Sequence, residues 1–341
     1  MILGIESSCD ETAIAVFDPK IGIQGEWIRS QIALHGKHGG VVPDLASREH
    51  VKELGPLIQL SKSKWSSGQL ESIAVTYGPG LAPCLALGVA AAKALALALN
   101  IPVKGVNHLR GHVWSVFIDT HRADPSHFDD ALDKVLPHLS LIASGGHTIL
   151  CRINKDRTID FLSSTRDDAA GEALDKGAKL LGLGYPGGPL IEKLAVGGNV
   201  NAFDFPRGLG RKSELEFSFS GLKTSLRYTL EAMEKTAVEV QMSDLCASYQ
   251  QAVVDALARK SRAALQLGNY RSLGLSGGVA NNGLLRKTMG LEAHRKQIPF
   301  FAARPEHTGD NAAMIAFAGF VDTARVMAGG FDLKIEPGLG L

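Results

Sequence analysis

The sequence has few cysteines and no excess of charge of either sign. Its four cysteines (Cys9, Cys84, Cys151 and Cys246) are scattered without a Cys-x-x-Cys pair, and no basic region followed by an apolar signal core opens the chain. Both absences favour a protein of the reducing cytoplasm. Lysine plus arginine (36) nearly cancels aspartate plus glutamate (35), so no chain-wide charge marks a nucleic-acid binder, although a local basic patch is not excluded.

Two nucleotide-binding signatures and an unambiguous membrane span are also missing. The chain contains no G-x-x-x-x-G-K-[ST] and no well-placed G-x-G-x-x-G, which argues against a P-loop and against a dinucleotide-binding fold. One apolar run, residues 81–100, approaches membrane-span length. It is mostly alanine and contains Pro83, Gly88 and Lys93, so we expect a buried or partner-facing helix and no membrane association.

The chain contains the same strand–turn–strand pattern twice. The segments "MILGIESSCDETAIAVFD" (residues 1–18) and "LSLIASGGHTILCRIN" (residues 139–154) both read as strand, polar turn, strand. Patterns of strand followed by helix come after each. With 341 residues and 45% hydrophobic content, the chain is expected to form two domains. The pattern predicts an α/β fold made by duplication, with helices covering the sheets.

Three glycine-containing turns follow predicted strands: "YGPGL" (77–81), "SGGHT" (144–148) and "SGGVANN" (276–282). Glycine allows close approach to the backbone, and the N–H groups exposed at such turns can hold phosphate. Any one of them alone is an ordinary turn. Together, in a duplicated α/β chain, they predict a nucleotide cleft between the halves.

The stretch "VNHLRGHVWS" places His108 and His112 four residues apart, where a strand is expected to run into a helix. On a helix both rings share one face, about 6 Å apart at Cβ, a spacing that many zinc enzymes use. Leu109 stands where a zinc peptidase needs its general base, which argues against a peptidase. The pair is either part of a metal site or a hydrogen-bonded interface pair, and Asp310 is either a third ligand or a helix N-cap.

Residues 202–224 combine basic and aromatic side chains. Arg207, Arg211 and Lys212 lie close together, with four phenylalanines (Phe203, Phe205, Phe217 and Phe219) interleaved. Such a mixture either lines a nucleic-acid surface or forms a solvated loop whose aromatics hold it to the body of the protein.

Taken in order and spacing, these segments resemble one family over residues 2 to about 320. The shared motifs include "GIESSCDETAIAV", "GGVVPDLASREH", "NHLRGH", "SGGHT", "DDAAGEALDKGAKLLGLGYPGGP", "FSFSGLKT", "SGGVANN" and "GDNAAMIA". The chain is similar to the TsaD family of tRNA N6-adenosine threonylcarbamoyltransferases, once described as glycoproteases. The resemblance implies the duplicated actin, Hsp70 and sugar-kinase fold (ASKHA, RNase H-like), with two lobes and an interlobe cleft. We expect one lobe over residues 1–107 plus about 311–341, and a second over 108–310.

The resemblance also assigns roles to residues. It implies that His108, His112 and Asp310 bind one divalent ion, Fe²⁺ or Zn²⁺, and it leaves open an additional ligand at His307. The substrate- and nucleotide-contacting positions it implies are Ile142, Ala143, Ser144, Gly145, Gly146, Asp175, Gly188 and Asn282. Asp10 or Glu11 is expected to act as a base or to support the metal site.

The reaction implied is transfer of the threonylcarbamoyl group from threonylcarbamoyl-adenylate to N6 of adenosine 37, beside the anticodon of tRNAs that read ANN codons, with release of AMP. The partners implied are tRNA, TsaB and TsaE, with a TsaC-type adenylate synthase upstream. A homodimer is a further option. Two other readings stay open: an ATP-dependent phosphotransferase or ATPase of the same superfamily, which has no need of the histidines, and a non-catalytic scaffold paralogue, which would lack the metal residues.

Overall fold

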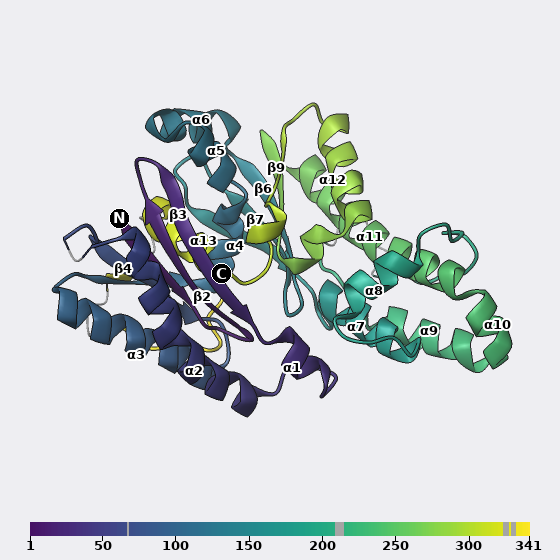
Figure 1. The fold of residues 1–341 in the computed structure, drawn as a ribbon. Helices are drawn as coiled ribbons and strands as arrows, with labels where there is room; N and C mark the ends of the chain where they lie inside the picture. The colour runs from purple at the N-terminus through teal and green to yellow at the C-terminus, as the bar shows by residue number, and fades with distance from the viewer. Residues whose placement is uncertain (67, 209–214, 323–326, 329–331) are drawn as a thin grey trace. The chain divides into compact units, whose positions relative to one another are not determined.

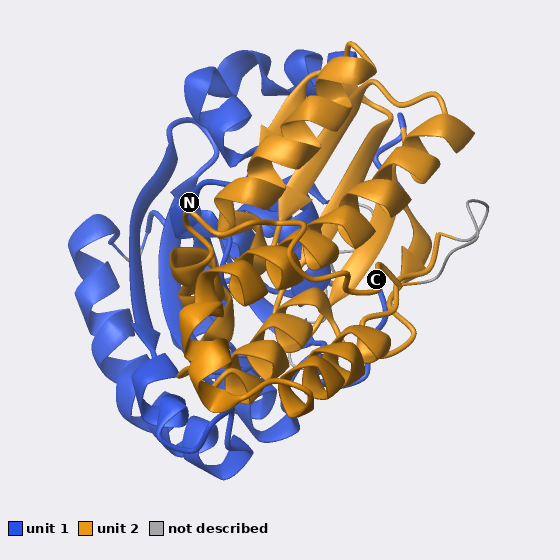
Figure 2. Ribbon diagram, turned by 90° about the vertical axis from the view of Figure 1, so that its right-hand side faces the viewer, with its two compact units in different colours: residues 1–134, 155–158, 303–341 blue, residues 135–154, 159–302 orange. Residues whose placement is uncertain are grey.

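The structure, a computed structural model, describes residues 1–66, 68–208, 215–322, 327–328 and 332–341. The chain forms two compact units (Figure 2). Unit 1 contains residues 1–134, 155–158 and 303–341, and unit 2 contains residues 135–154 and 159–302. Unit 1 is therefore built from both ends of the chain.

Unit 1 contains a six-stranded sheet in the order β11-β5-β4-β1-β2-β3 (Figure 1). Its strands are β1 (Ile2–Glu6), β2 (Glu11–Asp18), β3 (Gly22–Ser30), β4 (Ser72–Gly78), β5 (Val103–Asn107) and β11 (Met327–Ala328). The first three form an antiparallel meander, β4 and β5 continue the sheet in parallel with β1, and β11 pairs antiparallel with β5. The α-helices of this part are α1 (Ile32–Gly36), α2 (Pro43–Ser61), α3 (Ala82–Leu99), α4 (His108–Ser115), α5 (Ile118–Ala123), α6 (Phe128–Val135) and α13 (Ala312–Val321). Three 3₁₀ turns are η1 (Lys62–Lys64), η2 (Pro125–His127) and η4 (Pro305–His307).

The two faces of this sheet differ in side-chain size. Successive residues of a strand point to opposite faces. Large residues such as Ile5, Val16 and Val75 pack with α2 and α3 in one buried cluster. Beneath the start of α13 the opposite face carries the small residues Gly4, Ala13 and Ala15, and a Cβ on Gly4 would come within 2.3 Å of the Ala312 carbonyl oxygen. The small face therefore lets the backbone of α13 lie directly on the sheet.

Unit 2 repeats the connectivity of unit 1. Its five-stranded sheet has the order β10-β9-β6-β7-β8, with β6, β7 and β8 antiparallel and β9 and β10 in parallel with β6. The strands are β6 (His138–Ala143), β7 (Thr148–Ile153), β8 (Ile159–Ser164), β9 (Ser272–Ser276) and β10 (Phe300–Ala302). The helices are α7 (Ala170–Leu180), α8 (Gly187–Leu194), α9 (Ser220–Glu231), α10 (Lys235–Val240), α11 (Met242–Leu267) and α12 (Gly283–Arg295), with a 3₁₀ turn η3 (Gly278–Asn281). The expected duplication of an α/β motif is confirmed.

The unit boundaries differ from the expected ones. Residues 108–134, 155–158 and 303–310, expected in the second lobe, lie in unit 1. The reason is the packing of α4 on α13: a Cβ on Gly111 would lie 2.9 Å from Ile315 Cδ1 and 3.2 Å from Met314 Cγ. The two helices are held together by contacts between residues about 200 positions apart in sequence, which no local pattern reveals.

The alanine-rich run forms α3. By length and hydropathy it is the one helix among the described residues that could cross a membrane. Its buried side is instead part of the unit 1 core, where Val89, Ala92 and Ala96 pack in the same cluster as Leu3 and Ile73. Leu97 remains 68% exposed. The helix thus combines a core face with an exposed apolar face, as expected for a buried or partner-facing helix.

Candidate metal centre and ligand-binding turns

The two histidines lie on α4, which begins where β5 ends. Asn107 caps this helix: its Oδ1 accepts hydrogen bonds from the backbone N–H groups of Leu109 (2.8 Å) and Arg110 (3.3 Å). The cap fixes the first turn of the helix. His108 is therefore its first residue, and His112 follows one turn later on the same side.

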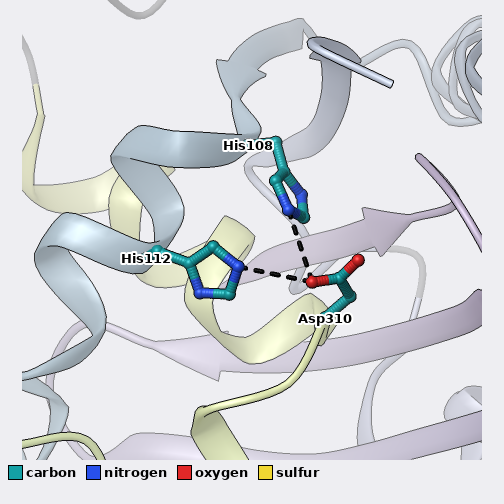
Figure 3. A group of neighbouring side chains, drawn as sticks. All are labelled: His108, His112 and Asp310. Atoms are coloured by element: carbon teal, nitrogen blue, oxygen red, sulfur yellow. Dashed lines mark hydrogen bonds and ion pairs between the residues drawn. The ribbon is translucent and has the colours of Figure 1, made fainter. Parts of the chain in front are cut away.

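Asp310 lies against both rings (Figure 3). Its Oδ1 is 3.3 Å from Nε2 of His108 and 3.3 Å from Nε2 of His112. Asn311, not Asp310, caps α13, because the Asn311 side chain accepts from the Met314 N–H at 2.8 Å. The N-cap alternative for Asp310 is therefore wrong.

The spacing of these three side chains fits a metal ion. Ligand atoms at the usual zinc distances of 2.0–2.1 Å, placed tetrahedrally, lie about 3.3 Å from one another. Within the described part of the chain, His108, His112 and Asp310 form one of two groups of side chains close enough to share an ion. Two imidazoles and a carboxylate are a common donor set for Zn²⁺ or Fe²⁺, with further coordination positions left open.

Charge is concentrated at this centre. Burial lowers the pKa of His108, but the carboxylates of Asp310 and Glu6 outweigh it and raise that pKa well above its ordinary value. Burial raises the pKa of Asp310, yet His108 and His112 hold it well below its ordinary value. The pKa of His112 is lowered, chiefly by burial. The carboxylates of Asp310 and Glu6 thus favour the protonated form of the His108 ring.

Glu6, which the motifs did not single out, lies on the far side of the His108 ring. Its Oε2 is 3.0 Å from His108 Nδ1 and accepts from Thr76 Oγ1 at 2.5 Å. The side chain is completely buried. The signal that could have found it is a glutamate ending the otherwise apolar strand "ILGIE", because a buried carboxylate needs partners.

Asp10 lies in the turn between β1 and β2, as expected, and Glu11 is the first residue of β2. Both carboxylates come close to Asp310. These three carboxylates form the second group that could hold an ion. Glu11 Oε1 accepts from Ser30 Oγ at 2.9 Å. Burial, together with the charges of Asp310 and Asp10, raises the pKa of Glu11 to about 9.

His307 belongs to a different cluster. It is not a member of either group of potential ligands among the described residues. It lines a separate cavity of about 340 Å³ together with Phe17, Ile118 and Glu26, and its Nδ1 lies 3.8 Å from Glu26 Oε2. Glu26 Oε1 accepts from the Ala313 N–H at 2.8 Å, so this carboxylate supports the start of α13.

Glu26 should make the stability of the protein depend on pH. Burial raises its pKa to about 7, from an ordinary value of 4.5, and burial also lowers the pKa of His307, so the neutral imidazole gives no counter-charge. The folded state therefore holds the Glu26 proton more tightly than the unfolded chain. The stabilisation is complete below about pH 4.5 and is lost as the pH rises through 7, a difference of about 3 kcal/mol.

Glu26→Gln, which cannot ionise, should gain stability relative to the unsubstituted protein between pH 5 and 8 in urea unfolding. Glu71→Gln, at a side chain that is 76% exposed, is the control and should show no such trend.

In unit 2, the predicted ligand-binding turns lie at neighbouring strand ends. The parallel strands β6 and β9 are paired at Ile142 and Ser276; β9 ends at Ser276 and β6 one residue later, at Ala143. Ser144 closes the first turn, accepting from the His147 N–H with its Oγ at 3.1 Å. Gly145 and Gly146 are exposed, and a Cβ on either would meet nothing within 4 Å. Their backbone therefore faces open space at the carboxyl end of a sheet, where α/β proteins bind ligands.

The other three predicted contact residues lie on the helices of unit 2 or at their starts. The N–H of Gly171 in α7 donates to the Ser144 carbonyl at 3.1 Å, which places that helix against the turn. Asp175, farther along α7, accepts from the Gly187 N–H at 2.7 Å and also from the Gly188 N–H, at the start of α8. Asn282 caps α12 and donates to Gln250 Oε1 at 2.9 Å. Asp175 and Asn282 thus already hold helix ends in place.

Aromatic side chains of the basic and aromatic segment, residues 202–224, are buried in the core of unit 2. Phe205, Phe217 and Phe219 are buried, which matches the reading of aromatics that hold a loop to the body. Arg207 is paired with Asp255 (3.1 Å) and Asp204 (2.8 Å). Arg211 and Lys212 lie outside the described residues.

Comparisons with known proteins agree with this geometry. A sequence model of the family described as TsaD, tRNA N6-adenosine threonylcarbamoyltransferase, matches residues 22–317. A protein of that name from Desulfitobacterium hafniense (strain Y51) is 43% identical over 342 residues, covering 100% of this chain and 97% of the relative. Another, from Thermosipho melanesiensis (strain DSM 12029 / CIP 104789 / BI429), is 43% identical over 346 residues and is covered completely, as is this chain.

Two solved structures share the fold. HypF from T. kodakarensis aligns with a TM-score of 0.59 at 15% identity, over 94% of this chain and 47% of that one. The activator of the 2-hydroxyisocaproyl-CoA dehydratase from Clostridium difficile, with bound ADPNP, aligns with a TM-score of 0.53 at 12% identity, over 94% of both chains. At these identities the likeness concerns the fold alone, and it confirms the expected duplicated ASKHA type.

Proposed function

The chain belongs to the TsaD family and is a tRNA N6-adenosine threonylcarbamoyltransferase, and from this premise we propose how its residues divide the work. The donor is threonylcarbamoyl-adenylate, and the acceptor is N6 of adenosine 37 in tRNAs that read ANN codons. The observation that carries the proposal is the Asp310 carboxylate placed 3.3 Å from Nε2 of both His108 and His112.

His108, His112 and Asp310 are the residues that would hold a divalent ion, Fe²⁺ or Zn²⁺. When bound, the ion supplies Lewis-acid polarisation of a carbonyl or phosphoryl oxygen. The three side chains come from α4 and from the loop that leads into α13, and α4 packs directly on α13 within unit 1. Their relative position is therefore set by the core of one unit.

The adenine amine is a weak nucleophile and must lose a proton during transfer, so a base is needed. Asp10 and Glu11 are the candidates, because both carboxylates lie close to Asp310. Asp10 or Glu11 would take that proton as the base, or would support the metal centre.

The adenylate is proposed to bind to unit 2. The open backbone at Gly145 and Gly146, next to Ser144, suits a phosphate group because exposed N–H groups bind anions. Ile142 and Ala143, the last two residues of β6, would lie next to the bound phosphate group. Asp175, Gly188 and Asn282 would contact the nucleoside, with Asp175 exchanging its bonds to the α8 amides for ribose hydroxyls.

The test is nucleoside analysis of tRNA from cells depleted of the protein. N6-threonylcarbamoyladenosine should disappear and return on expression of the unsubstituted chain, but not of His108→Ala. Unchanged nucleoside levels would contradict the transferase function. The phosphotransferase alternative predicts ATP-dependent phosphorylation that survives loss of His108, and a scaffold paralogue would need none of the three ligands.

The segment around Arg211 and Lys212 is proposed to contact tRNA phosphates. Arg207, already paired with two carboxylates, is a poor test residue because its loss would also disturb the fold. The logarithm of the binding constant falls linearly with the logarithm of the salt concentration, and each lost phosphate contact makes that slope shallower by about one. The double variant Arg211→Ala, Lys212→Ala should therefore make it shallower by about two in filter binding. Lys62→Ala, Lys64→Ala, at exposed positions of η1, is the matched control. An unaltered affinity and slope would contradict the proposed phosphate contacts.

TsaB, TsaE and an upstream TsaC-type synthase are the proposed protein partners, and the proposed location is the cytoplasm. The exposed face of α3 is the proposed contact surface for TsaB or for a second copy of the chain. Pro83, Ala86 and Leu87 line a groove there, and small residues let helices approach closely. Ala91 packs against the core, whereas Ala94 is exposed. Ala94→Arg should weaken TsaB association by about tenfold or more in a titration, about 1.4 kcal/mol. Ala232→Arg, at an exposed position of unit 2, should leave it unchanged. Equal affinities for the two variants would remove α3 from the interface.

A further inference from the structure

The buried carboxylate of Glu6 completes the metal centre without touching the ion. We propose that Glu6 is a positioning residue: it accepts the Nδ1–H of His108 and thereby keeps the Nε2 lone pair of that ring directed at the metal position. The inference rests on the metal-binding role proposed above for His108, His112 and Asp310.

The two nitrogens of His108 face different carboxylates. Nε2 lies 3.3 Å from Asp310 Oδ1, beside the other proposed ligand atoms, and Nδ1 lies 3.0 Å from Glu6 Oε2. A neutral imidazole that binds a metal with one nitrogen carries its proton on the other. With Nε2 assigned to the ion, Nδ1 is the N–H. Glu6 Oε2, at 3.0 Å, is the nearer and charged acceptor, and Ser8 Oγ lies 3.2 Å from the same nitrogen.

Glu6 is itself held from two sides. The backbone N–H of Ser8 donates to Oε1 at 2.5 Å, and Thr76 Oγ1 donates to Oε2 at 2.5 Å. These donors lie on the turn after β1 and on β4, so two separate segments of unit 1 fix the carboxylate. A carboxylate that receives this many donors is an acceptor in its charged form. It can therefore set both the rotation and the tautomer of the His108 ring.

His112 has no such support. Its Nδ1 is buried without a hydrogen-bond partner among the described residues. Its ring is oriented by packing and by Asp310 alone. The two ligand histidines are thus unequal, and the orientation of the pair depends on the Glu6 contact to His108.

The experiment measures metal binding and not only transfer. Zn²⁺ affinity is determined by competition with a chromophoric chelator, and the visible spectrum of the Co²⁺-loaded protein reports coordination geometry. Glu6→Gln removes the charge and turns an amide N–H₂ toward donors, so Zn²⁺ affinity should fall by about 10- to 100-fold and the Co²⁺ spectrum should change. Glu6→Asp keeps the charge but withdraws it by one methylene, and should give an intermediate loss. Should Glu6→Gln not fold, Glu6→Asp carries the test.

The matched control is Glu26→Gln, which changes another buried glutamate of unit 1 that contacts the start of α13 and neither ligand histidine. It should keep the Zn²⁺ affinity and the Co²⁺ spectrum. Loss of binding in Glu26→Gln equal to that in Glu6→Gln would overturn the inference, since any buried glutamate would then suffice. If the unsubstituted protein and both Glu6 variants had the same Zn²⁺ affinity and the same Co²⁺ spectrum, the role of Glu6 would be overturned, while the proposed metal site would stand. An unsubstituted protein that bound neither ion would overturn the proposed metal site, and the inference with it.

Discussion

His108→Ala and Asp310→Ala should each lose the metal ion and the transfer activity while the protein stays folded. Either change removes one of three protein ligands. Loss of an outer partner of a ligand already costs 10- to 100-fold in metal affinity, so loss of a ligand should cost more than about 100-fold. The fold should survive because His108 lies at the start of α4 and Asp310 ahead of α13, whereas the large buried cluster of unit 1 is built from the sheet, α2 and α3.

The measurements are metal content of the purified proteins, threonylcarbamoyl transfer to tRNA, and circular dichroism. His127→Ala, at a side chain that is 70% exposed, is the control and should retain both metal and activity. Threonylcarbamoyl transfer at the unsubstituted rate by a metal-free His108→Ala protein would mean that the histidines form only an interface pair. Loss of the ion in His307→Ala would make His307 an additional ligand despite its place in a separate cluster.

The second large effect is expected at the buried ion pair that joins α4 to the end of α13. Arg110 and Asp322 form a two-pronged pair, with NH2 donating to Oδ1 at 2.7 Å and Nε donating to Oδ2. Their exposed fractions are 5% and 4%. Arg110→Met leaves the Asp322 carboxylate buried without its partner and should lower the free energy of unfolding by about 3–5 kcal/mol.

The double variant Arg110→Met, Asp322→Leu should recover most of that loss, because replacing both members of a buried pair by apolar residues is often neutral. Urea unfolding at neutral pH measures each variant. Arg48→Met, which breaks an exposed pair with Asp44, is the control and should cost no more than about 1 kcal/mol. A loss of the same small size in Arg110→Met would show that the pair adds nothing beyond a surface contact.

The sequence was informative where a signal is local. The alternation in the two hairpins and the four-residue spacing of His108 and His112 are short-range patterns, and both took the predicted form. Resemblance to a family was needed to connect Asp310 to the histidines, since 198 residues separate it from His112.

Long-range packing and the state of single side chains could not be predicted in this way. Nothing local shows that Arg110 pairs with Asp322, or that α4 therefore belongs to unit 1. Glu6 ends a strand whose pattern is otherwise apolar, and only the fold places it beside His108. The same holds for Asp175, whose carboxylate caps α8 in addition to its predicted ligand contact.

The division of unit 1 between the two ends of the chain sets an order for its formation on the ribosome. A nascent chain that has emerged as far as residue 302 contains all of unit 2, yet it lacks α13 and Asp310. Until then Gly4 and the other small residues of the unit 1 sheet have no helix to cover them. Domains generally fold as units when their residues become available. Unit 2 can therefore fold during translation, whereas the metal centre closes only when the last tenth or so of the chain arrives, and a stalled chain would expose an uncovered sheet face to chaperones and proteases.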